Sequence, residues 1–241
     1  MNPASVRRGL VAGALLAFVL VAYGLVRIPS VFTASPTGIQ SVCGATVILI
    51  AYAVLGWFWI PRLARRNESI VRTASVAGLL AGTVFTVEIF LEYAILPENN
   101  TSFGLIEFGM VFASFAIASG VTTYRSRSWR TGVATAVATS LISSLIWIIA
   151  VLFAFYLFYG TGRQDAVLRA EGNYEDFAHS GMTDFHAFIM EDFLGACFYH
   201  LLMAPLLFAT VLGGIGAAIG AAAKRIVNGK SRQLDGSTGQ V

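Results

Sequence analysis

Six long runs of apolar residues alternate along the chain with short polar segments. Each run has roughly 20 residues or more, and ~20 is the number that a helix needs to cross the ~30 Å hydrocarbon core of a bilayer. The pattern therefore predicts six transmembrane helices and an all-α, polytopic membrane bundle. The runs cover residues 9–26, 40–60, 73–96, 103–122, 132–159 and 193–223.

Prolines fall at the breaks between these runs. Pro29 and Pro36 lie in the first loop, and Pro61 and Pro97 follow the second and third runs. Because proline has no amide proton and its ring clashes with the preceding turn, we expect Pro61 and Pro97 to end their helices. Pro205 lies within the last run, where it is expected to kink the helix.

The composition excludes a soluble domain. Of the 241 residues, 56% are hydrophobic and only 12% are charged, and the mean hydropathy is +0.73. This leaves too little polar surface to cover a soluble fold. The pI of 9.0 does not indicate a nucleic-acid partner, because the basic residues form short clusters between the apolar runs rather than one patch. Cys43 and Cys197 are too few for a disulfide scaffold.

Basic residues lie almost entirely in alternate segments, which predicts the topology. Thirteen of the sixteen lysines and arginines fall on one side of the predicted bundle, and the positive-inside rule makes that side cytoplasmic. We expect both termini in the cytoplasm and the protein in a bacterial-type inner membrane. A cleaved signal peptide is the alternative for the first run, which is long for one and has no small-residue cleavage site after it. The three cations on the outer side are Arg27, Arg163 and Arg169.

Small residues recur after an arginine at the start of the first, third and fifth helices, as Gly9/Gly13, Gly78/Gly82 and Gly132/Ala136. This spacing favours close helix packing and suggests three similar helical hairpins. The alternative is that any helix entering from the cytoplasm has this composition. The run Gly213–Gly220 is interpreted as a packing surface, since no Lys-Ser/Thr follows for a phosphate loop.

Two domain-level regions are predicted. Residues 1–223 form the transmembrane domain, and residues 224–241 are expected to be a disordered cytoplasmic tail. The outer loop at about residues 160–190 is the one long loop in the sequence, and it is either an amphipathic cap or a mobile acidic linker.

Ionisable residues inside the apolar runs mark the candidate site. Glu88 and Glu92 are four residues apart and share a helix face, and Glu107 begins the next helix. Asp192 and His200 reach the same level on the last helix.

Burying a carboxylate in hydrocarbon costs at least a few kcal/mol, so such groups usually face a cavity or a partner. If the helices are adjacent, the five residues surround one outward-facing polar cavity. The alternatives are that Glu92 reaches water, Glu88 is a neutral acid bonded to a neighbouring helix, and His200 is a core histidine.

Metal binding and catalysis receive less support from the sequence. Cys197 and His200 are three residues apart, and with His186 they are the candidate metal ligands. A bis-histidine haem needs ligands on separate helices, and all three histidines lie in or just before the last one. No His-Glu-x-x-His motif is present. We identify no catalytic residue and expect no cofactor.

Three functions remain open. The first is binding or transport of a small cationic or polar solute through the acidic cavity. The second is a packing or assembly subunit, as a homo-oligomer or with a membrane partner subunit, acting through glycine-rich helix faces. The third is an intramembrane metal-dependent enzyme. The bilayer is the one partner that all three require.

Overall fold

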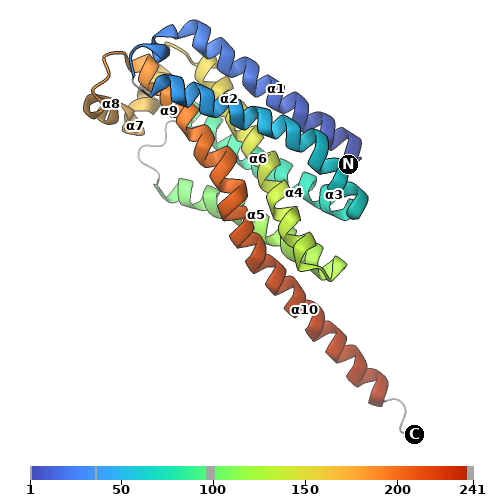
Figure 1. The fold of residues 1–241 in the computed structure, drawn as a ribbon. Coiled ribbons are helices and arrows are strands. Elements are labelled where there is room, and N and C mark those ends of the chain that lie inside the picture. Colours follow the sequence, from blue (N-terminus) through green and yellow to red (C-terminus); the bar gives the residue numbers. More distant parts are fainter. Residues whose placement is uncertain (1, 36, 96–100, 238–241) are drawn as a thin grey trace.

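The computed structural model describes residues 2–35, 37–95 and 101–237, and within them it contains helices and no strand (Figure 1). Six of the described helices are long and apolar enough to cross a membrane. The prediction of an all-α, multi-pass membrane bundle is confirmed. The helices are α1 (Pro3–Arg27), α2 (Gly38–Val54), α3 (Ile60–Arg66), α4 (Glu68–Ile95), α5 (Thr101–Ser126), α6 (Trp129–Leu157), α7 (Gly162–Ala170), α8 (Asn173–Ser180), α9 (Phe185–Cys197) and α10 (Ala209–Ser237), with a short 3₁₀ turn at Pro29–Phe32.

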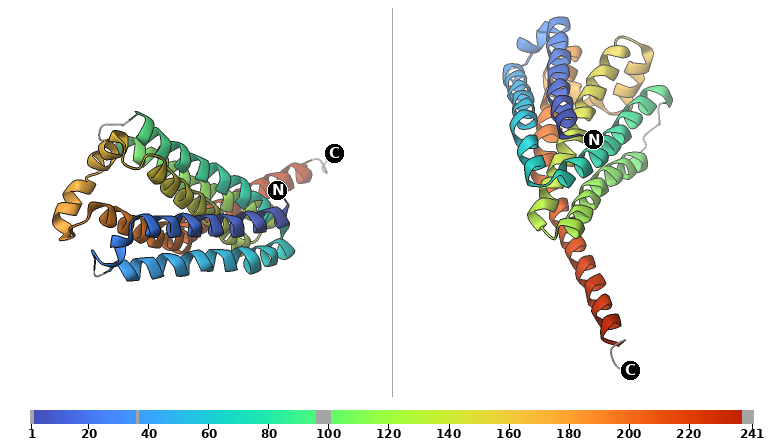
Figure 2. Two further views of the ribbon diagram at one scale, coloured as in Figure 1. Left: turned by 90° about the horizontal axis from the view of Figure 1, so that it is seen from above. Right: turned by 90° about the vertical axis from the view of Figure 1, so that its right-hand side faces the viewer.

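The bundle has two chemically different ends (Figures 1 and 2). One end holds the start of α1 and the turns from α3 to α4 and from α5 to α6; we call it the arginine end. The other holds α7 and α8, the ends of α1, α4 and α6, and the starts of α2, α5 and α9; we call it the acidic end.

Helix α6 is the central helix of the bundle, and its residues are buried on several faces. Gly78 and Gly82 of α4 let the two backbones approach closely. A Cβ atom at Gly82 would come within 2.6 Å of the Ile146 side chain, and one at Gly78 within 2.7 Å of Ile142. The two helices thus pack through the small-residue face that the sequence predicted.

Helices α5 and α10 cross through a second glycine contact. A Cβ atom at Gly216 would lie 2.0 Å from the backbone oxygen of Ala116, and one at Gly220 would lie 2.2 Å from that of Gly120. Ser119 Oγ donates to the Gly213 carbonyl across the same crossing, at 2.6 Å. The glycine run is therefore a packing surface inside the chain. The three repeated segments differ in their contacts, since Gly9 has nothing within 4 Å of an added Cβ.

Proline positions differ from the prediction. The second span continues through Pro61 to Arg66 instead of ending there, because a π-helical segment at Leu55–Trp59 precedes the proline and accommodates its missing amide proton. A second π-helical segment, Phe198–Phe208, contains Pro205 and joins α9 to α10. Pro36 and Pro97 lie outside the described residues.

The last span begins and ends beyond the predicted limits. It starts at Phe185 rather than residue 193, and α10 is helical to Ser237, through most of the segment 224–241 for which we expected disorder. The run of alanines before Lys224, and the lack of a following proline, favour continued helix. The C-terminal part of α10 projects away from the bundle (Figures 1 and 2).

The long segment at the acidic end folds into α7 and α8. Thr161 caps α7 by accepting from the Gln164 amide, and Arg163 Nη1 donates to the terminal carbonyls of α4, at 3.2 Å to Tyr93 and also to Ala94. Tyr174 donates to Asp165, and this bond, followed by the hydrogen bond from Arg169, lowers the pKa of Asp165. The Arg163 bonds attach α7 to the end of α4, and the Tyr174 bond joins α8 to α7.

Candidate functional site

A cavity of about 310 Å³ lies at the acidic end among α4, α5, α6, α7 and α9 and the π-helical segment that follows α9. We call it the acidic cavity. Glu88, Glu92, Glu107, Asp192 and His200 all line it, so the structure brings together the five residues that the sequence singled out. Their role in binding stays a prediction. The complete lining is Phe85, Glu88, Ile89, Glu92, Tyr93, Glu107, Phe108, Trp147, Val151, Leu168, Glu171, Asp192, Phe193, Ala196 and His200.

Three glutamates form the centre of the site. Glu88 and Glu92 are one helical turn apart near the end of α4, and Glu107 lies near the start of α5. The chain reverses direction between these helices, which places Glu107 within electrostatic range of both α4 carboxyls. Like charges at this range repel one another when ionised, and a cation between them would remove that repulsion.

Glu107 is the most buried of the acids, with 4% of its surface exposed. Its Oε1 atom is buried and has no hydrogen-bond partner among the described residues. A buried acceptor without a donor costs about 1–3 kcal/mol. The Glu107 carboxyl, which lines the acidic cavity, thus has an acceptor that a ligand N–H or a cation could satisfy. Glu88 and Glu92 are half-buried, and Asp192 is exposed at the edge of the cavity.

Glu171 belongs to the site although the sequence analysis did not select it. It follows the last turn of α7 and reaches the cavity together with Leu168. Poor hydration at the cavity mouth, followed by the nearby Glu92, raises the pKa of Glu171 to about 7, even though part of the residue remains open to solvent. Asn173 Nδ2 donates to its Oε2 at 2.9 Å. Nothing in the spacing of the loop acids distinguishes Glu171, because its position depends on how α7 packs against α4.

Aromatic rings form the other wall. The His200 imidazole stacks on the Trp147 indole, with centroids 3.6 Å apart and planes 14° apart. Phe85 meets the same imidazole edge-on at 6.4 Å. Phe108 and Phe193 complete this side of the cavity. Aromatic faces attract cations within about 6 Å of the ring centroid, so they suit the same class of ligand as the carboxylates.

The three candidate metal ligands are not brought together. His186 packs against Tyr159, with ring centroids 5.2 Å apart, and Cys197 is fully buried in the core beside Tyr52 of α2. Only His200 reaches the acidic cavity, since the π-helical segment that begins at Phe198 changes the face on which residues three apart fall. Within the part of the chain that the structure describes, no three His, Cys, Asp or Glu side chains are placed to hold one metal ion.

The arrangement combines several carboxyl groups, one unpaired buried oxygen and an aromatic wall, which is the chemistry that recognises a compact cation. No protein-family model, curated protein or solved structure matches the chain.

Proposed function

We propose that this multi-pass membrane protein binds a small organic cation in the acidic cavity. The observation that carries the proposal is the buried carboxyl of Glu107, whose Oε1 lacks a donor and which lines the cavity together with Glu88 and Glu92. An ammonium group would satisfy this oxygen and offset the repulsion among the three carboxylates.

The aromatic wall favours an organic cation over a metal ion. Trp147, Phe108 and Phe193 present apolar rings, which a hydrated metal ion does not use but an alkylated ammonium does. The cavity volume of about 310 Å³ is at the lower end for ligand pockets and suits a ligand of few heavy atoms.

We further propose that the cavity faces away from the cytoplasm, in the inner membrane of a bacterial-type cell. The support is the charge distribution: thirteen of the sixteen lysines and arginines belong to the other side of the bundle. The assembly alternative has less support, because Gly216 and Gly220, which suggested it, pack against α5 within the chain.

Thermal unfolding of the purified protein in phosphatidylcholine nanodiscs tests the proposal. Tetramethylammonium, tetraethylammonium and spermidine are the probes, and sodium chloride at equal ionic strength is the control. We expect at least one organic cation to raise the unfolding temperature while sodium does not. Glu107→Gln should lower the affinity for that cation about tenfold, which is equivalent to about 1.4 kcal/mol of binding free energy.

Glu68→Gln is the matched control, since it removes a carboxylate from the arginine end and leaves the acidic cavity intact. It should bind the cation as the unmodified protein does. The proposal is wrong if no organic cation stabilises the protein, or if Glu107→Gln and Glu68→Gln respond equally. Uptake of the stabilising cation into proteoliposomes then separates transport from binding alone.

A further inference from the structure

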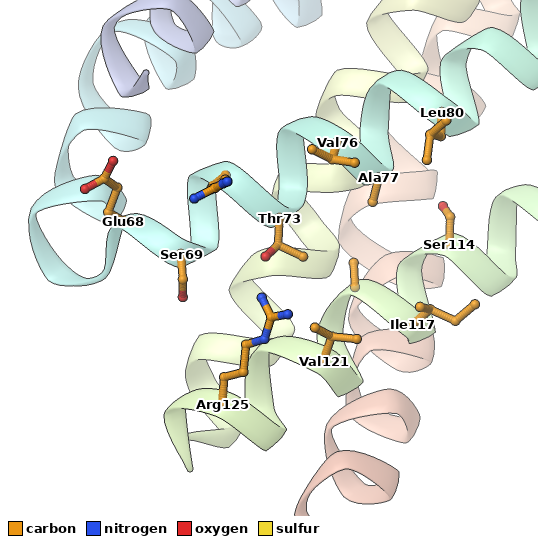
Figure 3. Close-up of a pocket in the computed structure, with 12 residues that line it drawn as sticks. Glu68, Ser69, Thr73, Val76, Ala77, Leu80, Ser114, Ile117, Val121 and Arg125 are labelled. Atoms are coloured by element: carbon orange, nitrogen blue, oxygen red, sulfur yellow. The ribbon is translucent and has the colours of Figure 1, made fainter. Parts of the chain in front are cut away.

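A second and larger cavity, of about 840 Å³, lies between α4 and α5 at the arginine end (Figure 3). We call it the basic groove. Two arginines, Arg72 and Arg125, stand at its polar mouth, one on each helix. The complete lining is Glu68, Ser69, Arg72, Thr73, Val76, Ala77, Leu80, Ser114, Ile117, Ala118, Val121 and Arg125.

The two arginines are available to a ligand. Both are exposed, and in the described part of the chain neither takes part in an ion pair; the one salt bridge there joins Arg169 to Asp165. Two other basic side chains at this end make cation–π contacts: Arg7 lies over the Trp57 ring and Lys224 over the Tyr124 ring.

The side chains in Figure 3 leave a positively charged opening. Arg125 extends from α5 toward Thr73 on α4, whereas the carboxyl group of Glu68 points away from the groove. Ser69 and Thr73 add hydroxyl groups beside the arginines. Guanidinium groups with neighbouring hydroxyls are well suited to phosphate, because the planar fork of arginine can donate two parallel hydrogen bonds to it.

Away from this mouth the groove becomes apolar on both helices. Val76 and Leu80 follow on α4, and their exposed fractions are 52% and 64%, while Ile117 on α5 is 63% exposed. Leu80 lies eight positions after Arg72, which is about 12 Å along the helix axis. A phosphate site is thus continuous with an apolar wall that runs toward the middle of the bilayer.

We propose that the basic groove binds one anionic phospholipid, with its phosphate between Arg72 and Arg125 and an acyl chain along Val76, Leu80 and Ile117. The charge of the mouth selects the anionic headgroup, and the apolar wall selects a molecule that carries a chain. Basic pockets between transmembrane helices are known to hold lipid headgroups in this way. This proposal uses different residues from the acidic cavity and stands independently of cation binding.

The test compares thermal unfolding in nanodiscs of phosphatidylcholine with and without phosphatidylglycerol of the same acyl chains. We expect phosphatidylglycerol to stabilise the unmodified protein. Arg72→Gln/Arg125→Gln should bind phosphatidylglycerol about tenfold more weakly, given the loss of two cations from the headgroup site. The matched control is Arg62→Gln/Arg66→Gln, which removes two exposed arginines from α3 at the same end without touching the groove.

A second variant covers the case in which the double arginine substitution impairs folding. Ile117→Trp keeps both arginines and fills the apolar wall at an exposed position. It should also reduce the phosphatidylglycerol effect, because the indole would occupy the place of the acyl chain.

Three results would overturn the proposal. If the groove variant and the control variant lost the same amount of phosphatidylglycerol affinity, the lipid would be attracted by the general positive charge of this end and not bound in the groove. Stabilisation by inorganic phosphate alone, equal to that by phosphatidylglycerol, would show an anion site without a lipid. A phosphatidylglycerol effect that survives both Arg72→Gln/Arg125→Gln and Ile117→Trp would place the lipid elsewhere.

Discussion

The imidazole of His200 lies nearly parallel to the indole of Trp147, with 3.6 Å between ring centroids. This stack forms part of the wall of the acidic cavity. His200 also lines a neighbouring apolar cavity of about 240 Å³, and Phe85 and Phe108 are shared between the two. The imidazole thus separates a charged space from an apolar one, and its contacts with Trp147 hold it in that position.

Removing this ring should join the two cavities. We expect His200→Ala to shift the preference of the protein from tetramethylammonium toward the larger tetraethylammonium, and to lower the free energy of unfolding by about 1 kcal/mol through loss of the stack. His200→Phe retains a flat ring and should keep the original preference. Thermal unfolding with each cation measures both effects, and equal preferences in the two variants would contradict the separating role.

Cation binding should depend on pH through Glu171, whose pKa is raised to about 7. The carboxyl is neutral below this pH and anionic above it, so affinity for the cation should rise between about pH 6 and about pH 8. Glu171→Gln should bind more weakly at high pH and show a smaller rise. Titrations of both proteins across this range check the prediction, and identical pH profiles would contradict it.

Glu171 should also make the stability of the cation-free protein depend on pH, and this stability should fall as the pH rises. The folded-state pKa of Glu171 lies above the ordinary value of 4.5, so between these values the unfolded chain binds fewer protons at this site. The contribution of Glu171 to the free energy of unfolding therefore falls as the pH rises from 4.5 to about 7. Glu171→Gln should remove this part of the pH dependence in denaturation measurements without cation. A profile unchanged by the substitution would contradict it.

The start of α9 should depend on Asp184. Its Oδ1 accepts from the amides of His186 at 2.9 Å and Ala187 at 3.1 Å, and the Ser30 hydroxyl, followed by the amide of Ala187, lowers its pKa. Loss of such a cap costs about 1 kcal/mol, so Asp184→Ala should lower the free energy of unfolding by that amount at neutral pH. The difference should shrink as the pH falls through the lowered pKa, since the stabilisation by a depressed carboxyl is present only above it. Asp176→Ala, at an exposed position on α8, is the control and should have little effect.

The crossing of α5 and α10 should not tolerate a methyl group. Gly216→Ala places a Cβ atom 2.0 Å from the Ala116 backbone oxygen, so the two helices must separate. We expect a loss of about 2 kcal/mol, within the range for overpacked sites. Gly9→Ala is the matched control because an added Cβ meets nothing within 4 Å. Unfolding temperatures of the two variants check this, and equal values would contradict the close packing.

Much of the fold and the geometry of the candidate site follow from local sequence rules. Apolar run lengths predicted the six spans, and the helical repeat placed Glu88 and Glu92 on one face. The chain reversal between α4 and α5 then brings Glu107 to the same level. Glu171 could not be found in this way, because its place depends on the packing of α7 on α4.

Other features depend on contacts that single-helix patterns do not contain. The basic groove depends on the distance between α4 and α5, which cannot be predicted from the sequence of either helix. Continuation of the second span through Pro61 depends on a local π-helical segment that proline rules do not anticipate. The candidate metal ligands Cys197 and His200 do not come together for the same reason, because Phe198 begins another such segment.

Helices α4 and α5 contribute walls to both the acidic cavity and the basic groove. Each is a continuous helix that reaches both ends of the bundle, so a tilt of one against the other about its middle would change both sites. If both sites are occupied as proposed, their free energies of binding are thermodynamically linked, and the factor by which lipid changes cation affinity equals the factor by which cation changes lipid affinity. The lipid composition of one leaflet would then regulate what the protein binds from the opposite side of the membrane.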